Sequence, residues 1–286
     1  MELTATTSYL AADDGTRLAL HLIGASEPLL CLPGGPLLDS AYLGDLGGLA
    51  AHRALARLDL RGTGASAVPA DPSSYRCDRQ VADVDAARRH LGLDRIDLLA
   101  HSAGANLAYR YAERHPDRVG RLLLVAPSTR GVGIEISDDA RTAVARQRAG
   151  ETWYAQAAAA LERVQAGSED EADWQAVSAF MYGRWDDETR AYEAWMDGLR
   201  DEEKALAWGA EGAYDPAATR AALATLDVPV LVLAGRVDAG NPTPAMAEVA
   251  ALFPSGELVV QEGAGHFPWV DDPQGFITPI RLWCDL

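Results

Sequence analysis

Short, continuous apolar runs recur along this chain, and segments with helical periodicity separate them. The runs lack strict alternation of apolar and polar residues, which is typical of strands buried on both faces. They lie at residues 29–32, 54–60, 96–100, 122–125, 230–234 and 258–260. The helical segments lie at residues 78–91, 104–114, 243–252 and 276–283. This order of elements predicts a doubly wound α/β domain with a mostly parallel central sheet.

The chain begins with a different pattern. Residues 8–11 and 17–23 are two β-type runs that flank Asp13-Asp14-Gly15. An Asp-Gly pair favours a tight turn because glycine reaches positive φ without strain. We therefore expect an N-terminal antiparallel hairpin in front of the parallel strands.

The interval 131–215 breaks the alternation of strands and helices. It contains acidic and alanine-rich helical stretches and shows no strand pattern. Five of the seven tryptophans of the chain lie there: Trp153, Trp174, Trp185, Trp195 and Trp208. We expect a helical insertion that covers one edge of the sheet as a cap, with residues 1–130 and 216–286 forming the core.

Composition excludes several classes of function. Asp and Glu number 42 against 25 Lys and Arg, a net charge of −17 that would repel nucleic acids and anionic membranes. The one lysine, Lys204, lies in no phosphate-binding or Schiff-base motif. Cys31, Cys77 and Cys284 are odd in number and form no Cys-x-x-Cys pair, which favours a reducing cytoplasm over a disulfide framework or a zinc site. We expect no metal, no cofactor and no membrane-spanning segment, since no apolar run approaches the roughly 20 residues of a span.

Ser102 is the candidate nucleophile. The predicted strand 96–100 runs into His101-Ser102-Ala103-Gly104 and then into the predicted helix 104–114. A nucleophile elbow joins a strand to a helix through a sharp turn that needs small residues two before and two after the serine, here Ala100 and Gly104. Such a turn lifts the hydroxyl next to a helix N-terminus, where developing negative charge is favoured. The alternative is that Ser102 only caps the helix.

A serine hydroxyl needs a histidine to accept its proton and a carboxylate to orient that histidine. His266 follows the predicted strand 258–260 in a glycine-rich loop, so it is the favoured base. Asp238 lies in the loop after the predicted strand 230–234 and is the favoured acid, although a lone Asp in such a loop is more often a turn or cap residue. The other histidines are expected to be structural or exposed: His21, His52, His90, His101 and His115.

The candidate oxyanion hole follows the predicted strand 29–32. Pro33-Gly34-Gly35-Pro36 brings main-chain amides to the same edge of the sheet, where they can approach a substrate oxygen closely. Pro36 has no N–H to donate. The amides of Gly35 and Ala103 are therefore the predicted donors, while the alternative is that this segment is only a turn.

Taken in this order, the motifs resemble those of the α/β-hydrolase family over nearly all of the chain apart from the cap. Residues 59–66, Asp-Leu-Arg-Gly-Thr-Gly-Ala-Ser, look like the Asp-x-Arg-Gly-x-Gly-x-Ser loop common in that family. With the Gly-Gly-Pro loop, this motif is closest to the proline iminopeptidase-like and esterase-like branch. The chain differs from iminopeptidases at Ala103, where they usually carry an aromatic residue, and at Pro33 and Leu37 of their usual His-Gly-Gly-Pro-Gly.

A second pattern, Gly62-x-Gly64-x-x-Ala67, is similar to the dinucleotide-binding fingerprint. That fingerprint needs a helix to begin at its glycines, and Pro69 and Pro72 predict a loop instead. Two further classes stay open, a nonhydrolytic enzyme that uses the same triad and a binding protein on the same fold.

We therefore predict a cofactor-independent serine hydrolase that cleaves a small-molecule ester, thioester or amide through an acyl-enzyme on Ser102. The alternative is a proline iminopeptidase, which would need carboxylates for the substrate ammonium. Candidate substrate-binding residues of the cap are Trp185, Trp195, Trp208 and Glu193. The acids of this region, Glu193 included, are interpreted mainly as a solvated helix face: Glu193, Asp197, Asp201, Glu202, Glu203 and Glu211. The oligomeric state is left open.

Overall fold

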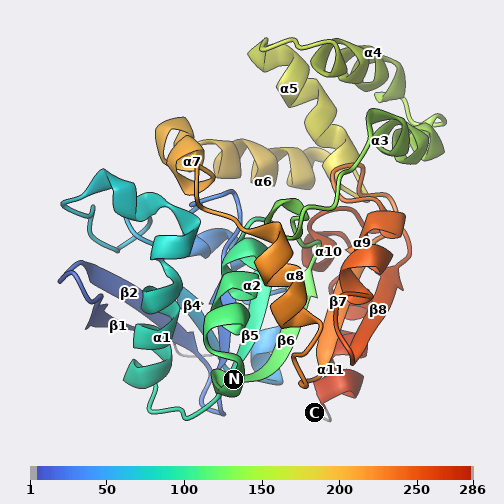
Figure 1. The fold of residues 1–286 in the computed structure, drawn as a ribbon. Coiled ribbons are helices and arrows are strands. Elements are labelled where there is room, and N and C mark those ends of the chain that lie inside the picture. The colour runs from blue at the N-terminus through green and yellow to red at the C-terminus, as the bar shows by residue number, and fades with distance from the viewer. Residues whose placement is uncertain (1–4, 285–286) are drawn as a thin grey trace.

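The computed structural model describes residues 5–284, and within them eight strands form one sheet in the order β1-β2-β4-β3-β5-β6-β7-β8 (Figure 1). The strands are β1 (Ala5–Ala11), β2 (Arg17–Ile23), β3 (Leu29–Leu32), β4 (Leu55–Leu58), β5 (Ile96–His101), β6 (Val119–Val125), β7 (Val230–Gly235) and β8 (Gly256–Gln261). From β4 to β8 every neighbouring pair in this order is parallel. The predicted parallel sheet is confirmed, with bounds that differ by a few residues at some strand ends.

The predicted hairpin is confirmed. β1 pairs with β2 in antiparallel register from Ala5 opposite Ile23 to Ala11 opposite Arg17. β1 begins before the predicted residue 8 because its ladder continues beyond the segment that the side-chain pattern marks. β2 in turn pairs antiparallel with β4, which joins the hairpin to the parallel strands.

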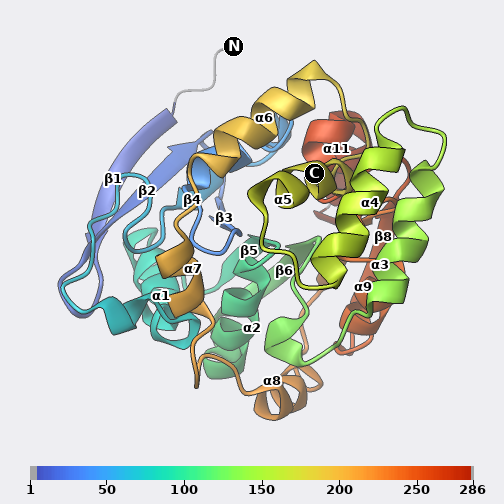
Figure 2. The ribbon, with the colours of Figure 1, turned by 90° about the horizontal axis from the view of Figure 1, so that it is seen from above.

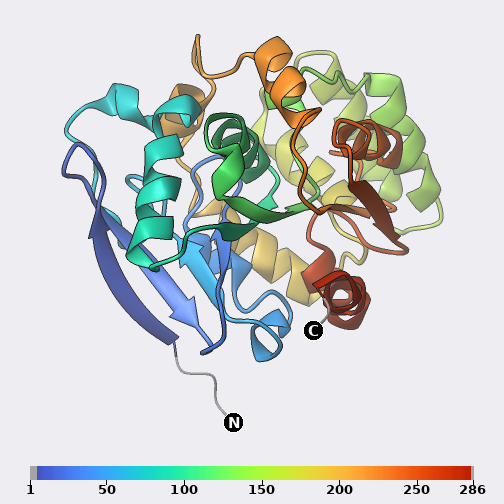
Figure 3. The ribbon, with the colours of Figure 1, turned by 60° about the horizontal axis from the view of Figure 1, so that its bottom comes forward.

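Helices cover both faces of the sheet (Figure 3). Those of the alternating core are α1 (Val81–His90), α2 (Gly104–Arg114), α8 (Pro216–Leu223), α9 (Thr243–Ala250), α10 (Pro268–Asp271) and α11 (Pro273–Cys284). Short 3₁₀ helices complete the connections: η1 (Ser40–Leu43), η2 (Leu49–Ala51), η3 (Pro72–Tyr75), η4 (Cys77–Arg79), η5 (Pro116–Arg118), η6 (Arg130–Val132), η7 (Arg146–Arg148) and η8 (Ser178–Met181). The predicted helix 104–114 is found with the same bounds, whereas the helix predicted at 78–91 begins only at Val81.

The parallel strands are buried on both faces because successive side chains enter two different apolar cores. In β5, Leu98 and Ala100 pack into the core beneath α1, α2 and α9, while Leu99 packs into the core on the side of α10 and α11. β6 divides its side chains in the same way, with Leu124 on one face and Val125 on the other. This two-sided burial explains the continuous apolar runs of the sequence.

Between β6 and β7, an interval that is described throughout, every regular element is a helix. The α-helices that precede α8 there are α3 (Asp138–Ala145), α4 (Tyr154–Gln165), α5 (Glu171–Val177), α6 (Asp187–Asp197) and α7 (Glu202–Trp208). Figure 1 shows them above the sheet, and Figure 2 shows α6 and α7 on the side of β2 and β4, with α3, α4 and α5 on the side of α9 and β8. The division into a core of residues 1–130 and 216–286 and a cap of residues 131–215 stays a prediction.

The loop after β4 is held by two buried carboxylates. Asp59 accepts hydrogen bonds from Ser40 Oγ at 2.5 Å and from the Ala65 amide at 2.8 Å. Arg61 binds both carboxylate oxygens of Asp83 in α1, at 2.6 and 2.8 Å. No α-helix lies between residues 62 and 80 of this described stretch, as the two prolines predict, so the helix that a dinucleotide fingerprint needs is missing there.

The Arg61–Asp83 pair generates a test of stability. Its side chains are 4% and 1% exposed, against 55% and 69% in the surface pair Arg89–Asp13. Because Asp83→Ala leaves a buried guanidinium short of a partner, we expect it to lower the free energy of unfolding by about 3 kcal/mol. Asp13→Ala, the matched control, should change that free energy by less than about 0.5 kcal/mol. Urea unfolding measures both, and equal losses would contradict the buried role of Asp83.

Candidate active site

Ser102 lies in the sharp turn between β5 and α2, and its φ of +50° falls in the left-handed region that non-glycine residues rarely adopt. The turn is held from both sides, since the Ser102 amide donates to the Val125 carbonyl at 3.0 Å and the Ser128 amide donates to the Ser102 carbonyl at 2.9 Å. A Cβ at Gly104 would lie 2.6 Å from the carbonyl oxygens of Leu32 and Pro33. Only glycine therefore lets the start of α2 lie this close to the end of β3.

Asp238 and His266 form a buried pair. Oδ2 of Asp238 lies 2.7 Å from Nδ1 of His266, and the acid is fully buried. Oδ1 of Asp238 accepts hydrogen bonds from the amides of Gly240 and Asn241 at 2.8 and 3.0 Å. The carboxylate is thus fixed on both oxygens, and a proton on Nδ1 leaves Nε2 of His266 as the basic nitrogen.

The same pair lies beside the turn that carries Ser102. Nε2 of His101, the residue before Ser102, lies 2.9 Å from the His266 carbonyl oxygen, and the two imidazole rings are 4.9 Å apart. Within residues 5–284, no hydrogen bond joins the Ser102 hydroxyl to the His266 ring. Catalytic hydrogen bonds are often long without substrate and shorten in the complex, so this observation does not count against Ser102 and His266 as candidates.

The loop after β3 lies against Ser102 and Ala103. A Cβ at Gly34 would lie 2.8 Å from Ser102 Cβ and 3.3 Å from the Ala103 nitrogen. The Gly34 amide already donates to the Tyr42 hydroxyl at 2.7 Å. The amides of Gly35, which is exposed, and of Ala103 donate to no acceptor in the described part of the chain. These two amides therefore remain the candidate oxyanion donors that the sequence predicts.

Three of the four candidates, Trp185, Trp195 and Glu193, lie around Tyr182 and Tyr192, whereas Trp208 lies apart from them. Trp185 packs beside Tyr182, with ring centroids 5.4 Å apart, and Trp195 is exposed. Trp208 is buried with the side chains beneath α1 and α2. Glu193 is already bound by protein donors, because its carboxylate accepts from the Tyr182 hydroxyl at 2.6 Å and from Ser178 Oγ at 3.0 Å.

The remaining acids of the cap lie mostly on its outer surface. Asp201 caps α7 and pairs with Lys204 at 2.9 Å. Asp197 pairs with Arg200 at 3.1 Å on an exposed face of α6. The others are exposed: Glu202, Glu203 and Glu211.

Sequence analysis missed the segment 180–184, which lies in the predicted cap and is hydrogen-bonded to both candidate catalytic loops. The Phe180 carbonyl accepts from the Ala239 amide at 3.3 Å, and the Met181 carbonyl accepts from the His266 amide at 2.7 Å. Asp271 links the same segment to the base loop by accepting from the Gly265 amide at 2.8 Å and the Arg184 amide at 3.3 Å. Burial raises the pKa of Asp271. Main-chain acceptors carry no side-chain signal, so no sequence pattern could have identified them.

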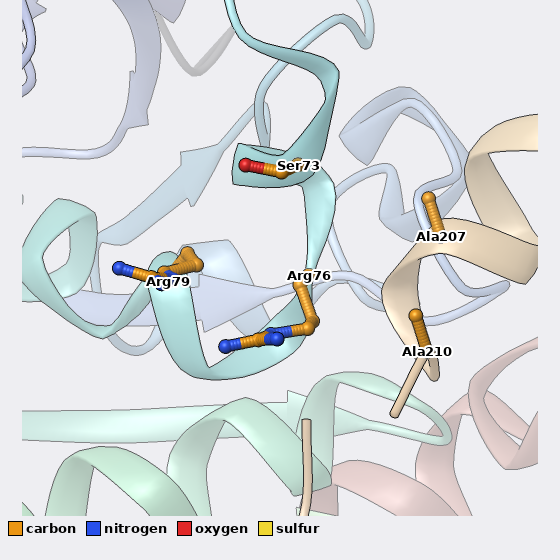
Figure 4. A pocket seen from close by; sticks show the side chains of 5 residues that line it. All are labelled: Ser73, Arg76, Arg79, Ala207 and Ala210. Carbon is orange, nitrogen blue, oxygen red and sulfur yellow. The ribbon is translucent and has the colours of Figure 1, made fainter. Parts of the chain in front are cut away.

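Two hollows of the surface lie away from this site. One, of about 170 Å³, is lined by Ser73, Arg76, Arg79, Ala207 and Ala210 (Figure 4). The other, of about 440 Å³, includes Glu27, Arg53 and Cys284. Neither contains Ser102, Asp238 or His266, and the chemistry of the side chains rather than the shape of the surface identifies the candidate site.

Residues 5–284 contain no cluster of three His, Cys, Asp or Glu side chains placed to hold a metal ion. None of the helices described is long and apolar enough to cross a membrane.

Comparison with known proteins decides the family. Residues 27–273 match the model of the alpha/beta hydrolase fold family, a stretch that contains every candidate catalytic residue. The chain belongs to the α/β-hydrolase family. N-formylmaleamate deformylase of Pseudomonas putida is 30% identical over 230 residues, which cover 80% of this chain and 77% of that one.

Two solved structures share the α/β-hydrolase fold over nearly the whole chain. Proline iminopeptidase of Mycobacterium smegmatis has a TM-score of 0.75 at 20% identity and 98% coverage of both chains. An esterase of Exiguobacterium antarcticum has a TM-score of 0.74 at 18% identity, with 98% of this chain and 100% of that chain covered. The resemblance to the iminopeptidase-like and esterase-like branch is therefore confirmed at the level of family and fold.

Proposed function

We propose that this α/β hydrolase is a serine hydrolase that cleaves a small-molecule ester, thioester or amide through an acyl-enzyme on Ser102. One observation carries the proposal: a buried carboxylate holds the His266 ring at 2.7 Å beside a serine in a strained strand-to-helix turn. Strained backbone of this kind persists where the surrounding structure enforces it, and it clusters at active sites. A helix cap would need neither the strain nor the buried pair.

The proposed reaction begins when Nε2 of His266 accepts the Ser102 proton and Oγ forms a bond to the acyl carbon. The carbonyl π electrons move onto oxygen, and the Gly35 and Ala103 amides donate hydrogen bonds to that oxyanion. Collapse of this intermediate breaks the bond to the leaving group, which takes the proton from His266. Whenever His266 is protonated, the Asp238 carboxylate stabilises the imidazolium by accepting a hydrogen bond from Nδ1–H.

Water completes the cycle. His266 accepts a proton from water as the hydroxyl oxygen attacks the acyl carbon, and collapse returns the proton to Ser102 Oγ and frees the carboxylic acid. All of these proton transfers use one imidazole, so the reaction needs no cofactor. The relative reported above is named as a deformylase of N-formylmaleamate, and the steps proposed here apply equally to amides and esters.

The predicted cap, residues 131–215, is proposed to shape the substrate site. Its segment 180–184 is bonded to the loops of both Asp238 and His266, so it lies against the catalytic groups. Two of the candidate partners for a substrate ammonium, Glu193 and Asp201, are only partly exposed. Both are already bound by protein groups, Glu193 by Tyr182 and Ser178 and Asp201 by Lys204. We therefore infer a neutral acyl group as the preferred substrate, ahead of an N-terminal proline.

Ser102→Ala should abolish covalent labelling by a fluorophosphonate probe and reduce kcat for p-nitrophenyl esters by roughly a million-fold, as loss of a triad serine does elsewhere. The thermal unfolding temperature should change little, because only one hydroxyl is removed. Intact-protein mass spectrometry and steady-state kinetics measure both effects. If the variant retains most of the activity, the acyl-enzyme mechanism is wrong.

Asp238→Asn should reduce kcat by up to about 10⁴-fold, because an amide at this position favours the wrong tautomer of His266. Glu262→Gln is the matched control, since Glu262 is exposed and, within residues 5–284, pairs with Arg236 alone, at 2.7 Å. That control should leave kcat within about threefold of wild type. A large loss of kcat at Glu262 with none at Asp238 would show that Asp238 is not the carboxylate that orients His266.

N-acetylation of an aminoacyl naphthylamide should change kcat/KM by less than about 100-fold, the ratio that corresponds to about 2.7 kcal/mol of ammonium recognition. Neutral p-nitrophenyl esters should be cleaved at least as well as the aminoacyl amides. The comparison needs only the two matched substrates and wild-type protein. A larger penalty for acetylation would favour the iminopeptidase alternative.

A further inference from the structure

The side chain of His101 is buried beside the candidate catalytic groups and has partners on both ring nitrogens. It is 2% exposed and packs against the rings of Tyr42, Phe267 and Trp269, with the Trp269 ring 4.8 Å away. Nε2 lies 2.9 Å from the His266 carbonyl oxygen, and Nδ1 lies 2.7 Å from the Tyr42 hydroxyl. The proposed mechanism gives this ring no role.

These partners determine where the proton of His101 lies. A carbonyl oxygen can only accept, so Nε2 of His101 donates to the His266 carbonyl. Burial, together with the nearby His266 ring, lowers the pKa of His101 well below that of an ordinary histidine, which keeps the ring neutral at pH 7. Nδ1 therefore carries no proton and accepts from the Tyr42 hydroxyl.

The Tyr42 hydroxyl is bonded on its other side to the oxyanion loop. It accepts from the Gly34 amide at 2.7 Å, and Gly34 directly precedes Gly35. The directions of the three hydrogen bonds agree: Gly34 N–H donates to Tyr42, Tyr42 donates to His101, and His101 donates to the His266 carbonyl. Both side chains are almost inaccessible to solvent, so water does not compete for these bonds.

We propose that His101 and Tyr42 are positioning residues that hold the oxyanion loop and the base loop in register with Ser102. The inference rests on the proposed function, because it assigns the roles of Gly35 and His266 given there. The hydrogen-bonded chain (Gly34, Tyr42, His101 and the His266 carbonyl) joins loops that follow β3 and β8 through the residue before the nucleophile.

Two physical reasons favour this role. The nucleophile, the base and the oxyanion donors lie on separate loops, and a displacement of about 1 Å between reacting groups can cost on the order of 100-fold in rate. A neutral ring also matters, because a second positive charge 4.9 Å from His266 would oppose formation of its imidazolium. The hydrogen-bonded chain thus supports the two loops without adding a positive charge beside His266.

Tyr42→Phe keeps the aromatic ring and removes the hydroxyl that links Gly34 to His101. We expect kcat for a neutral p-nitrophenyl ester to fall about 10- to 100-fold, with KM changed less than about threefold, because positioning rather than binding is lost. The rate of fluorophosphonate labelling should fall in parallel. His101→Gln, which can still donate toward the His266 carbonyl, should retain more activity than His101→Leu.

Tyr192→Phe is the matched control. Its hydroxyl donates to the Tyr42 main-chain carbonyl at 2.7 Å. The variant therefore removes a hydrogen bond from the same aromatic cluster and leaves the hydrogen-bonded chain from Gly34 to the His266 carbonyl intact. Its kcat and labelling rate should stay within about threefold of wild type. Circular dichroism and thermal unfolding of each variant separate loss of fold from loss of positioning.

The outcomes are distinct. If folded Tyr42→Phe and His101→Leu keep wild-type kcat and labelling rate while Ser102→Ala loses both, the positioning role is wrong and the proposed function stands. If wild type is not labelled at Ser102, the proposed function fails and the positioning role fails with it. If a variant does not fold, imidazole nitrogen NMR of the wild-type protein provides the test. A neutral His101 protonated on Nε2 supports the inference, and protonation on Nδ1 overturns it.

Discussion

The close approach of α2 to the end of β3 is the contact on which the candidate site depends. Gly104 packs against the carbonyl oxygens of Leu32 and Pro33, where any larger residue would overlap them. This contact accompanies the approach of the loop after β3 to Ser102, where a Cβ at Gly34 would lie 2.8 Å from Ser102 Cβ. A parallel sheet makes such a meeting possible because the carboxyl ends of neighbouring strands share one edge.

His266 is held in three ways, and each involves a different part of the chain. Its ring is bound by Asp238, its carbonyl by His101 and its amide by Met181 of the helical interval between β6 and β7. Movement of residues 180–184 would therefore change the position of the base as well as the shape of the substrate site. Under the proposed function, substrate binding and proton transfer are mechanically linked.

The motif at residues 59–66 shows how resemblance and role differ. Its buried Asp59 and Arg61 bind Ser40, Ala65 and Asp83, and within residues 5–284 neither forms a hydrogen bond or ion pair with a candidate catalytic residue. The motif supported the family assignment correctly, yet its structural role is to hold the loop after β4 against α1. Family likeness identified the fold here, whereas the role of each residue came from its contacts.

By itself the sequence determined the succession of strands and helices along the α/β core, the hairpin and the small residues around Ser102, because local periodicity and local sterics decide these features. The order of the strands within the sheet came from the structure. It also predicted Asp238 as the acid and His266 as the base from their places after predicted strands, and the structure brings these two side chains into contact. Only the tertiary structure decided that Tyr42 and His101 meet, that Glu193 is occupied and that Met181 holds the base loop. Tyr42 and His101 are 59 residues apart, and His101 and His266 are 165 apart. Contacts over such separations depend on the packing of whole elements, which no local pattern encodes.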